Sequence, residues 1–201
     1  FRNTAISGSI GASSFAAKVD FTVGASAIYP AIGDLDGDGK PELAVVNNLS
    51  NVSIFRNTTT VGSITSASFA AKVDFSAGIG ASPQCVAMGD LDGNGKPDLV
   101  LSNGANNTIS IFRNTSTLGI INAASFAAKV DLSTGESPEM VSVGDLDGDR
   151  KADIVTANYN YSGSSGGGVS VFRNGDLPPV ITSFTPVSAK PGDVVTLTGT
   201  G

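Results

Sequence analysis

Carboxylate and amide side chains recur at a fixed spacing in three short segments of this 201-residue chain. Each segment carries oxygen-bearing side chains at relative positions 1, 3, 5 and 9, and a lysine at position 7. The residues are Asp34, Asp36, Asp38, Lys40 and Glu42 in the first loop, Asp90, Asp92, Asn94, Lys96 and Asp98 in the second, and Asp145, Asp147, Asp149, Lys151 and Asp153 in the third. Like charges this close together repel one another, so each loop needs something that offsets them.

A solvated acidic loop, a catalytic pair of carboxylates and a cation site are three interpretations of these segments. A solvated loop explains the charge but not one spacing found three times. A catalytic pair needs an acid with a raised pKa in an apolar pocket, whereas these acids stand beside Gly and Asp. Side chains at positions 1, 3 and 5 and the carbonyl at position 7 form the arc that binds a hard cation, which favours Ca²⁺, up to one per loop.

The loops differ from an EF-hand and from a dockerin, because those motifs need an acid or its equivalent at position 12. Here position 12 is Val45, Leu101 or Thr156, and position 9 supplies the closing acid instead. Glycine at positions 4 and 6 permits tight winding in the first two loops. The third loop has Arg150 at position 6, which predicts a strained residue and a weaker site.

The composition excludes several classes of function. Histidine is absent, which removes Ser-His-Asp and Cys-His catalysis and His-ligated zinc. The net charge is −6 and no basic cluster exists, so nucleic acid is not an expected partner. No apolar run reaches the roughly 18 residues of a membrane span. The single Cys85 is predicted to be a buried thiol. The only acid pair outside the loops is Glu136 with Glu139, which lies in an ordinary loop. We therefore expect no enzyme in these residues.

Three sequence markers recur in the same order and define an internal repeat of about 55 residues. The markers are FRN from Phe1, Phe55, Phe112 and Phe172, SFAAKVD from Ser14, Ser68 and Ser125, and GDLDG from Gly33, Gly89 and Gly144. In SFAAKVDF, apolar residues alternate with others at a period of two, which predicts a strand over Phe15–Phe21 and its equivalents. The FRN arginine is expected to cover a neighbouring repeat.

Each repeat contains four short apolar runs, and those around the acidic loop are apolar on both faces. This pattern predicts an all-β fold made of four-stranded β-propeller blades, with a parallel β-helix as the main alternative. We expect acidic-loop units around residues 23–75, 76–132 and 133–174, further blades of the same chain upstream, and a ring closed by an N-terminal strand that completes the last blade. Residues 175–179 are predicted to form a linker.

Residues 1–174 resemble the FG-GAP/VCBS repeat, the blade of integrin-α propellers and of many secreted bacterial proteins, on segments such as VAMGDLDGNGKPDLVLSN. The resemblance implies that the hairpin loop of each blade binds Ca²⁺ through the fifteen residues named above, the lysines by their carbonyls only. Residues 180–201 resemble the truncated start of a TIG/IPT immunoglobulin-like domain, on ITSFTPVSAKPGDVVTLTGTG.

The expected function is therefore a non-catalytic, calcium-binding module of a larger secreted or cell-surface protein, serving as a scaffold, in adhesion or in ligand binding. Its expected partner is a protein or a glycan at the extracellular surface. The alternatives are a lectin-like propeller, for which Tyr159 and Tyr161 offer a small stacking surface, and an accessory module of a polysaccharide-degrading enzyme.

Overall fold

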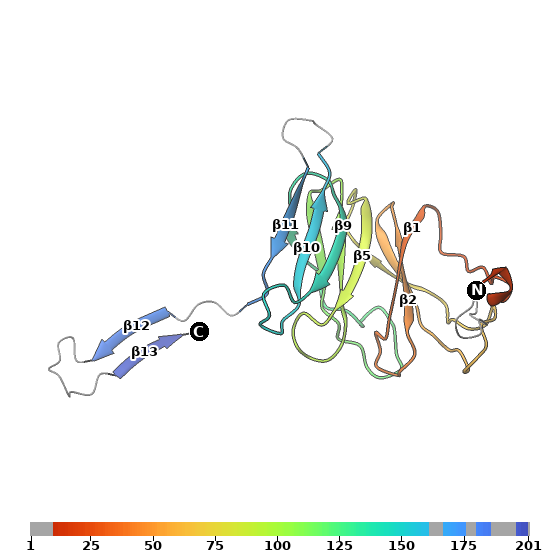
Figure 1. Ribbon diagram of the computed structural model, residues 1–201, viewed down its shortest axis with the longest axis horizontal. Coiled ribbons are helices and arrows are strands. Elements are labelled where there is room, and N and C mark those ends of the chain that lie inside the picture. The colour runs from red at the N-terminus through yellow and green to blue at the C-terminus, as the bar shows by residue number, and fades with distance from the viewer. Residues whose placement is uncertain (1–9, 161–166, 176–179, 186–195, 201) are drawn as a thin grey trace.

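The computed structural model describes residues 10–160, 167–175, 180–185 and 196–200. These residues form an all-β structure in which one 3-10 turn, Ala12–Ser14, precedes thirteen strands. Three antiparallel sheets stand side by side, and a separate two-stranded hairpin follows them (Figure 1). The prediction of an all-β chain built from propeller-type blades is confirmed. Within the described part of the chain, no helix is long and apolar enough to cross a membrane.

Each sheet contains strands in their chain order. The first sheet consists of β1 (Ala27–Gly33), β2 (Glu42–Asn47), β3 (Asn51–Phe55) and β4 (Val73–Ser76). The second consists of β5 (Pro83–Gly89), β6 (Asp98–Asn103), β7 (Thr108–Phe112) and β8 (Val130–Ser133). The third consists of β9 (Pro138–Gly144), β10 (Asp153–Asn158) and β11 (Gly168–Phe172), and the hairpin of β12 (Val180–Thr185) and β13 (Thr196–Thr200).

The fourth strand of the first and second sheets is shorter than the alternating pattern predicts. Phe69 and Phe126 form only isolated bridges, with Asn57 and Asn114, and regular pairing begins at Val73 and Val130. The prediction of a strand over Phe15–Phe21 is wrong, because no strand falls between residues 10 and 26. Phe15 forms a single bridge, and no regular ladder follows it in the described part of this segment.

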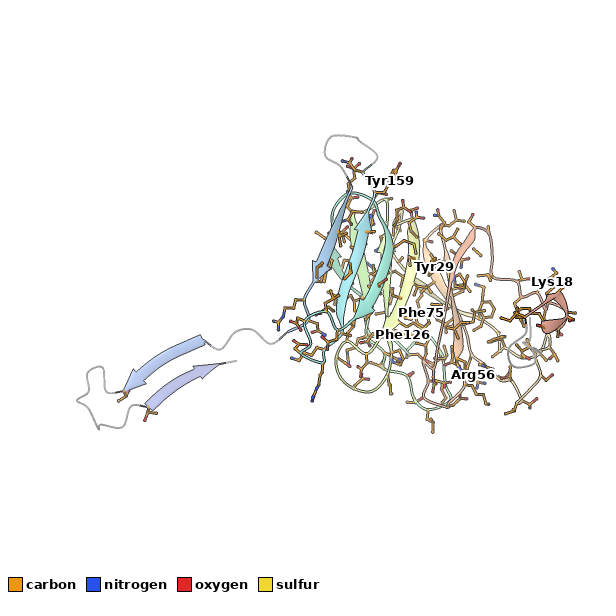
Figure 2. All side chains as sticks on the ribbon, in the orientation of Figure 1. Lys18, Tyr29, Arg56, Phe75, Phe126 and Tyr159 are labelled. Atoms are coloured by element: carbon orange, nitrogen blue, oxygen red, sulfur yellow. The ribbon has the colours of Figure 1, made fainter. Side chains whose placement is uncertain are left out.

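The core consists of two apolar layers, one at each junction between neighbouring sheets. The layer between the first two sheets includes Leu35, Val46, Ile54, Phe75, Leu99, Leu101 and Phe126, and the layer between the second and third includes Cys85, Val100, Ile109, Val141 and Ile154. Phe75 meets Phe126 edge to face across the first junction, with ring centroids 4.9 Å apart (Figure 2). Cys85 is buried as predicted, and burial raises the pKa of its thiol.

The last residue of each first strand is glycine, and at the first two of these glycines a side chain of the next sheet occupies the space of a Cβ. A Cβ on Gly33 would lie 2.7 Å from Met88 Sδ, and one on Gly89 would lie 2.4 Å from Val143 Cγ1. Met88 and Val143 each immediately precede the equivalent glycine of the following sheet. The glycine of GDLDG therefore provides the space for a side chain of the next blade.

Substituting Gly89→Val should lower the free energy of unfolding by about 1–3 kcal/mol, because the added methyl groups overpack the junction at Val143. Chemical denaturation monitored by fluorescence or circular dichroism measures this change. Gly144→Val is the matched control, since no atom lies within 4 Å of a Cβ at that position. Equal losses in both variants would contradict the assigned packing.

Candidate metal centres

The three acidic loops occupy equivalent places in the three sheets. Each loop joins the first strand of a sheet to the second: β1 to β2, β5 to β6, and β9 to β10. Residues at positions 1, 3 and 9 meet in every loop, with one carboxylate oxygen of each within 4.8 Å of the other two. The clusters are Asp34, Asp36 and Glu42; Asp90, Asp92 and Asp98; and Asp145, Asp147 and Asp153. Each of the three could hold a metal ion.

The acid at position 9 is the first residue of the second strand and is almost completely buried in all three loops. Glu42 Oε2 accepts the Leu35 N–H at 2.7 Å, and its Oε1 accepts the Asn57 N–H at 3.1 Å. The same two bonds recur at the other loops: Asp98 accepts from Leu91 and Asn114, and Asp153 accepts from Leu146 and Asn174. The position-9 acid thus ties the start of its loop to the end of the third strand.

The acid at position 1 organises the turn of the loop. Asp34 accepts the N–H groups of Gly37 and Gly39 at 2.8 and 2.9 Å, one on each carboxylate oxygen. Those glycines have φ of +76° and +82°, a conformation that costs other residues strain. Arg150 takes φ of +71° at the equivalent of Gly39, as the sequence predicts, and donates its N–H to Asp145 Oδ2 at 2.9 Å.

The surroundings of the acid at position 3 bear on whether a cation would suit the first loop. Asp36 is buried, its Oδ1 accepts the Asp38 N–H, and its Oδ2 is buried without a hydrogen-bond partner. A buried carboxylate oxygen without a partner is costly, and a bound cation would satisfy it. Burial raises the pKa of Asp36 and of Glu42, so without a cation the folded loop resists the ionised form that a metal needs.

The second and third loops carry the same acids in a more exposed setting, with arginine as a neighbour. Arg173 Nε donates to Asp147, and its Nη2 donates to Asp149 Oδ2 at 3.1 Å. This hydrogen bond lowers the pKa of Asp147. Arg113 Nη1 lies 3.8 Å from Asp92 Oδ2. Both arginines therefore offset the acids of their own loop. Coverage of a neighbouring repeat by the FRN arginine stays a prediction.

Positions 5 and 7 lie outside the three clusters of acids. The side chains of Asp38, Asn94 and Asp149 each accept the N–H of the lysine two residues later, at 2.8–2.9 Å. These bonds fix the turn that follows position 5. Ligation by position 5 and by the carbonyls of Lys40, Lys96 and Lys151 stays a prediction from the sequence.

The FRN asparagine is a structural residue of the site that the sequence interpretation missed. Its N–H donates to the position-9 acid, and its side-chain amide donates to the carbonyl of the residue before that acid in all three sheets. The amides of Asn114 and Asn174 also donate to Leu35 O and Leu91 O, in the acidic loop of the preceding sheet, at 2.8 and 2.6 Å. The recurrence of Asn in every copy of the FRN marker could have indicated this role.

Tyr159, predicted for sugar stacking, and the acid pair Glu136 and Glu139 lie away from the clusters. Tyr159 is exposed beyond the end of β10, the opposite end from the acidic loops (Figure 2), and Tyr161 falls outside the described residues. Glu136 and Glu139 line a shallow depression with Ser82, Gln84 and Asn107 between the second and third sheets. The structure therefore brings neither Tyr159 nor the pair Glu136 and Glu139 to the acidic loops.

Sheets that repeat in sequence, each with an acidic hairpin loop, define a protein of the blade-repeat class. The family model described as FG-GAP-like repeat matches residues 34–101 and again 90–156, and the model described as FG-GAP repeat matches residues 141–172. The chain belongs to the FG-GAP-like repeat family. These matches do not include residues 176–201, and no curated protein matches the chain.

Replacing Asn114 by alanine should lower the free energy of unfolding by about 1–3 kcal/mol, because the buried carbonyls of Leu35 and Pro97 lose a donor. Asn57→Ala is the matched control: its amide donates to Pro41 O but to no preceding loop, so its loss should be smaller. Urea denaturation of both variants measures the difference, and equal losses would refute a role of Asn114 between sheets.

Replacing Arg150 by glycine should raise the free energy of unfolding by about 0.5–1 kcal/mol, since the left-handed conformation costs an L-residue more than glycine. The reciprocal change, Gly95→Arg in the second loop, should lower it by a similar amount, because Gly95 has φ of +84°. Thermal denaturation of the two variants measures both shifts. A stabilising Gly95→Arg would contradict the strain at this position.

Proposed function

We propose that the three acidic loops bind Ca²⁺ and that the module is a non-catalytic scaffold of a larger secreted or cell-surface protein. One observation carries the proposal. The same three carboxylates converge in all three blades, and in the first blade one of their oxygens, Asp36 Oδ2, is buried without a hydrogen-bond partner. A buried acceptor in a cluster of acids is the arrangement that a cation stabilises.

The donor set favours calcium over softer metals. All clustered ligand atoms are carboxylate oxygens, the chain has no histidine, and its single cysteine is buried in the core. Hard oxygen ligands, with room for carbonyls and water, suit Ca²⁺. The loops hold 11 of the 18 acidic residues, and three divalent ions would offset the formal charge of −6.

The three sites should differ in affinity because their surroundings differ. The first combines buried acids with glycine at both turn positions. The second has a neutral Asn94 at position 5. In the third, Arg173 already pairs with Asp147 and Asp149, so a cation must compete with a guanidinium. The expected order of affinity is first, second, third.

A bound ion would act on stability, because it links the loop acids to the buried position-9 acid, which in turn holds the third strand. Calcium modules outside the cell typically bind at about 10⁻⁴–10⁻³ M, which fits an exported protein. Protein or glycan ligands remain the proposed partners. For the hairpin β12–β13, the strand pairing supports our proposal that residues 180–201 begin a TIG/IPT-like domain.

Calcium should raise the melting temperature of chelator-treated protein, since each site filled to ten times its Kd adds about 1.4 kcal/mol to the free energy of unfolding. Isothermal titration calorimetry should count three sites in the wild type and one fewer in Asp36→Asn. Asp74→Asn, outside the loops, is the control: it loses the ion pair with Lys72 but should keep the calcium-dependent increment. An unchanged melting temperature with and without calcium would overturn the proposal.

A further inference from the structure

Three asparagines of the chain are followed directly by glycine: Asn94, Asn103 and Asn174. Asparagine is one of the thermolabile residues, because its side-chain amide can be lost by reaction with the next backbone nitrogen. Glycine at the next position favours this reaction, since it has no Cβ to shield that nitrogen. The structure places the three asparagines in different surroundings, so they should react at different rates.

The reaction needs only water as a second reactant. The backbone nitrogen of the glycine attacks Cγ of the asparagine, and negative charge develops on Oδ1. The bond from Cγ to the side-chain nitrogen then breaks, and that nitrogen leaves as ammonia with the proton of the backbone N–H. The product is a five-membered imide, which water opens at either carbonyl to give an aspartate or an isoaspartate. Both products carry a carboxylate that is ionised at neutral pH.

Asn94 lies in the second acidic loop with its leaving group open to solvent. Both Asn94 and Gly95 are exposed, and no atom lies within 4 Å of a Cβ at Gly95. In the described part of the chain, the side-chain nitrogen of Asn94 donates no hydrogen bond. Release of ammonia from Asn94 therefore breaks no contact of the folded loop.

The side-chain oxygen of Asn94 is held by a donor that favours the attack. Asn94 Oδ1 accepts the N–H of Lys96 at 2.8 Å. A backbone donor fixed at the oxygen that gains negative charge lowers the barrier of an acyl reaction. The N–H of Gly95 donates to Asp90 Oδ2 at 2.8 Å, and this one bond must open before the nitrogen can attack. The loop should thus react more slowly than an unfolded chain, but it contains no other obstacle.

The other two asparagines are protected by the hydrogen bonds of their side-chain nitrogens. Asn103 is only 1% exposed, and a Cβ on Gly104 would lie 3.2 Å from Gln84 Cγ. Ammonia could leave either residue only after two hydrogen bonds break. These bonds join Asn103 Nδ2 to Thr108 Oγ1 and Ser110 Oγ, and Asn174 Nδ2 to Leu91 O and Ala152 O.

We propose that Asn94 is a site of spontaneous deamidation, which converts the single amide of the acidic loops into a carboxylate. The other two loops show that an aspartate fits this position. Asp38 and Asp149 each accept the N–H of the lysine two residues later, as Asn94 does. The aspartate product can therefore keep this turn. The isoaspartate product adds a methylene to the backbone and changes it.

The modification itself does not depend on a metal, whereas its consequence for cation binding rests on the proposed function. The second loop has three acids, and the first and third have four each. Deamidation to aspartate brings the second loop to four. Because the number of charged ligands tunes calcium affinity, Asn94→Asp should bind calcium at the second site several-fold more tightly than the unmodified chain.

Peptide mapping by mass spectrometry tests the modification in folded protein incubated with a chelator. The mass increase that replaces NH2 by OH should appear at Asn94 at least about tenfold faster than at Asn103 or Asn174. The same incubation in urea is the control, since the three residues should react at similar rates once the chain is unfolded. Asn94→Gln is the matched variant: it keeps an amide at position 5, but glutamine would need a six-membered ring, so this peptide should stay intact.

Two results of the mapping would overturn the proposal. One is an Asn94 that stays intact in the folded chain while the unfolded chain reacts, and the other is an equal rate at Asn94 and Asn103 in the folded chain. Isothermal titration calorimetry of Asn94→Asp tests the consequence separately. An unchanged affinity at the second site would refute the effect of position 5 on the cation, and a chain that binds no calcium at any loop would refute the proposed function, while the mapping alone decides the modification.

Discussion

The structure depends on one buried acid in each blade. The carboxylate at position 9 sits at the start of the second strand and accepts an N–H from the acidic loop and another from the end of the third strand. A buried charge is costly unless it is paired with donors. These two bonds meet that cost at three equivalent places, and they fix the loop relative to the sheet. The cation clusters are assembled on this fixed point.

The FRN asparagine extends the same arrangement from one blade to the next. The N–H of Asn114 reaches the acid of its own blade, and its side chain reaches the carbonyl of Leu35 in the preceding blade. Leu35 itself is buried in the junction between the two sheets. The acidic loop, the apolar core and the order of the blades are therefore connected through a few residues.

Much of this could be predicted from the sequence because each blade is a local unit. Short apolar runs on either side of the recurring loop identify the strands. The spacing also predicts convergence of the acids at positions 1, 3 and 9, whereas the convergence that it predicts for position 5 is not among the three clusters. The short fourth strand and the role of Arg173 could not be predicted in the same way. Both depend on what lies beside a segment in three dimensions: Phe126 pairs through an isolated bridge, and Arg173 turns toward its own loop. A pattern within one strand contains no information about either neighbour.

Repetition itself provides an internal control that a non-repeating protein lacks. One position of the repeat can be examined in two surroundings. Gly89 faces Val143 of the next sheet, whereas its equivalent Gly144 has no atom within 4 Å of a Cβ. The comparison separates what a residue type does for its own sheet from what it does for the next sheet. Asp36, Asp92 and Asp147 allow the same comparison, because all three occupy position 3 of their loop. Their common spacing brings the acids together, whereas the burial that favours a bound ion differs between loops. Asp36 is buried, whereas its equivalents Asp92 and Asp147 are exposed.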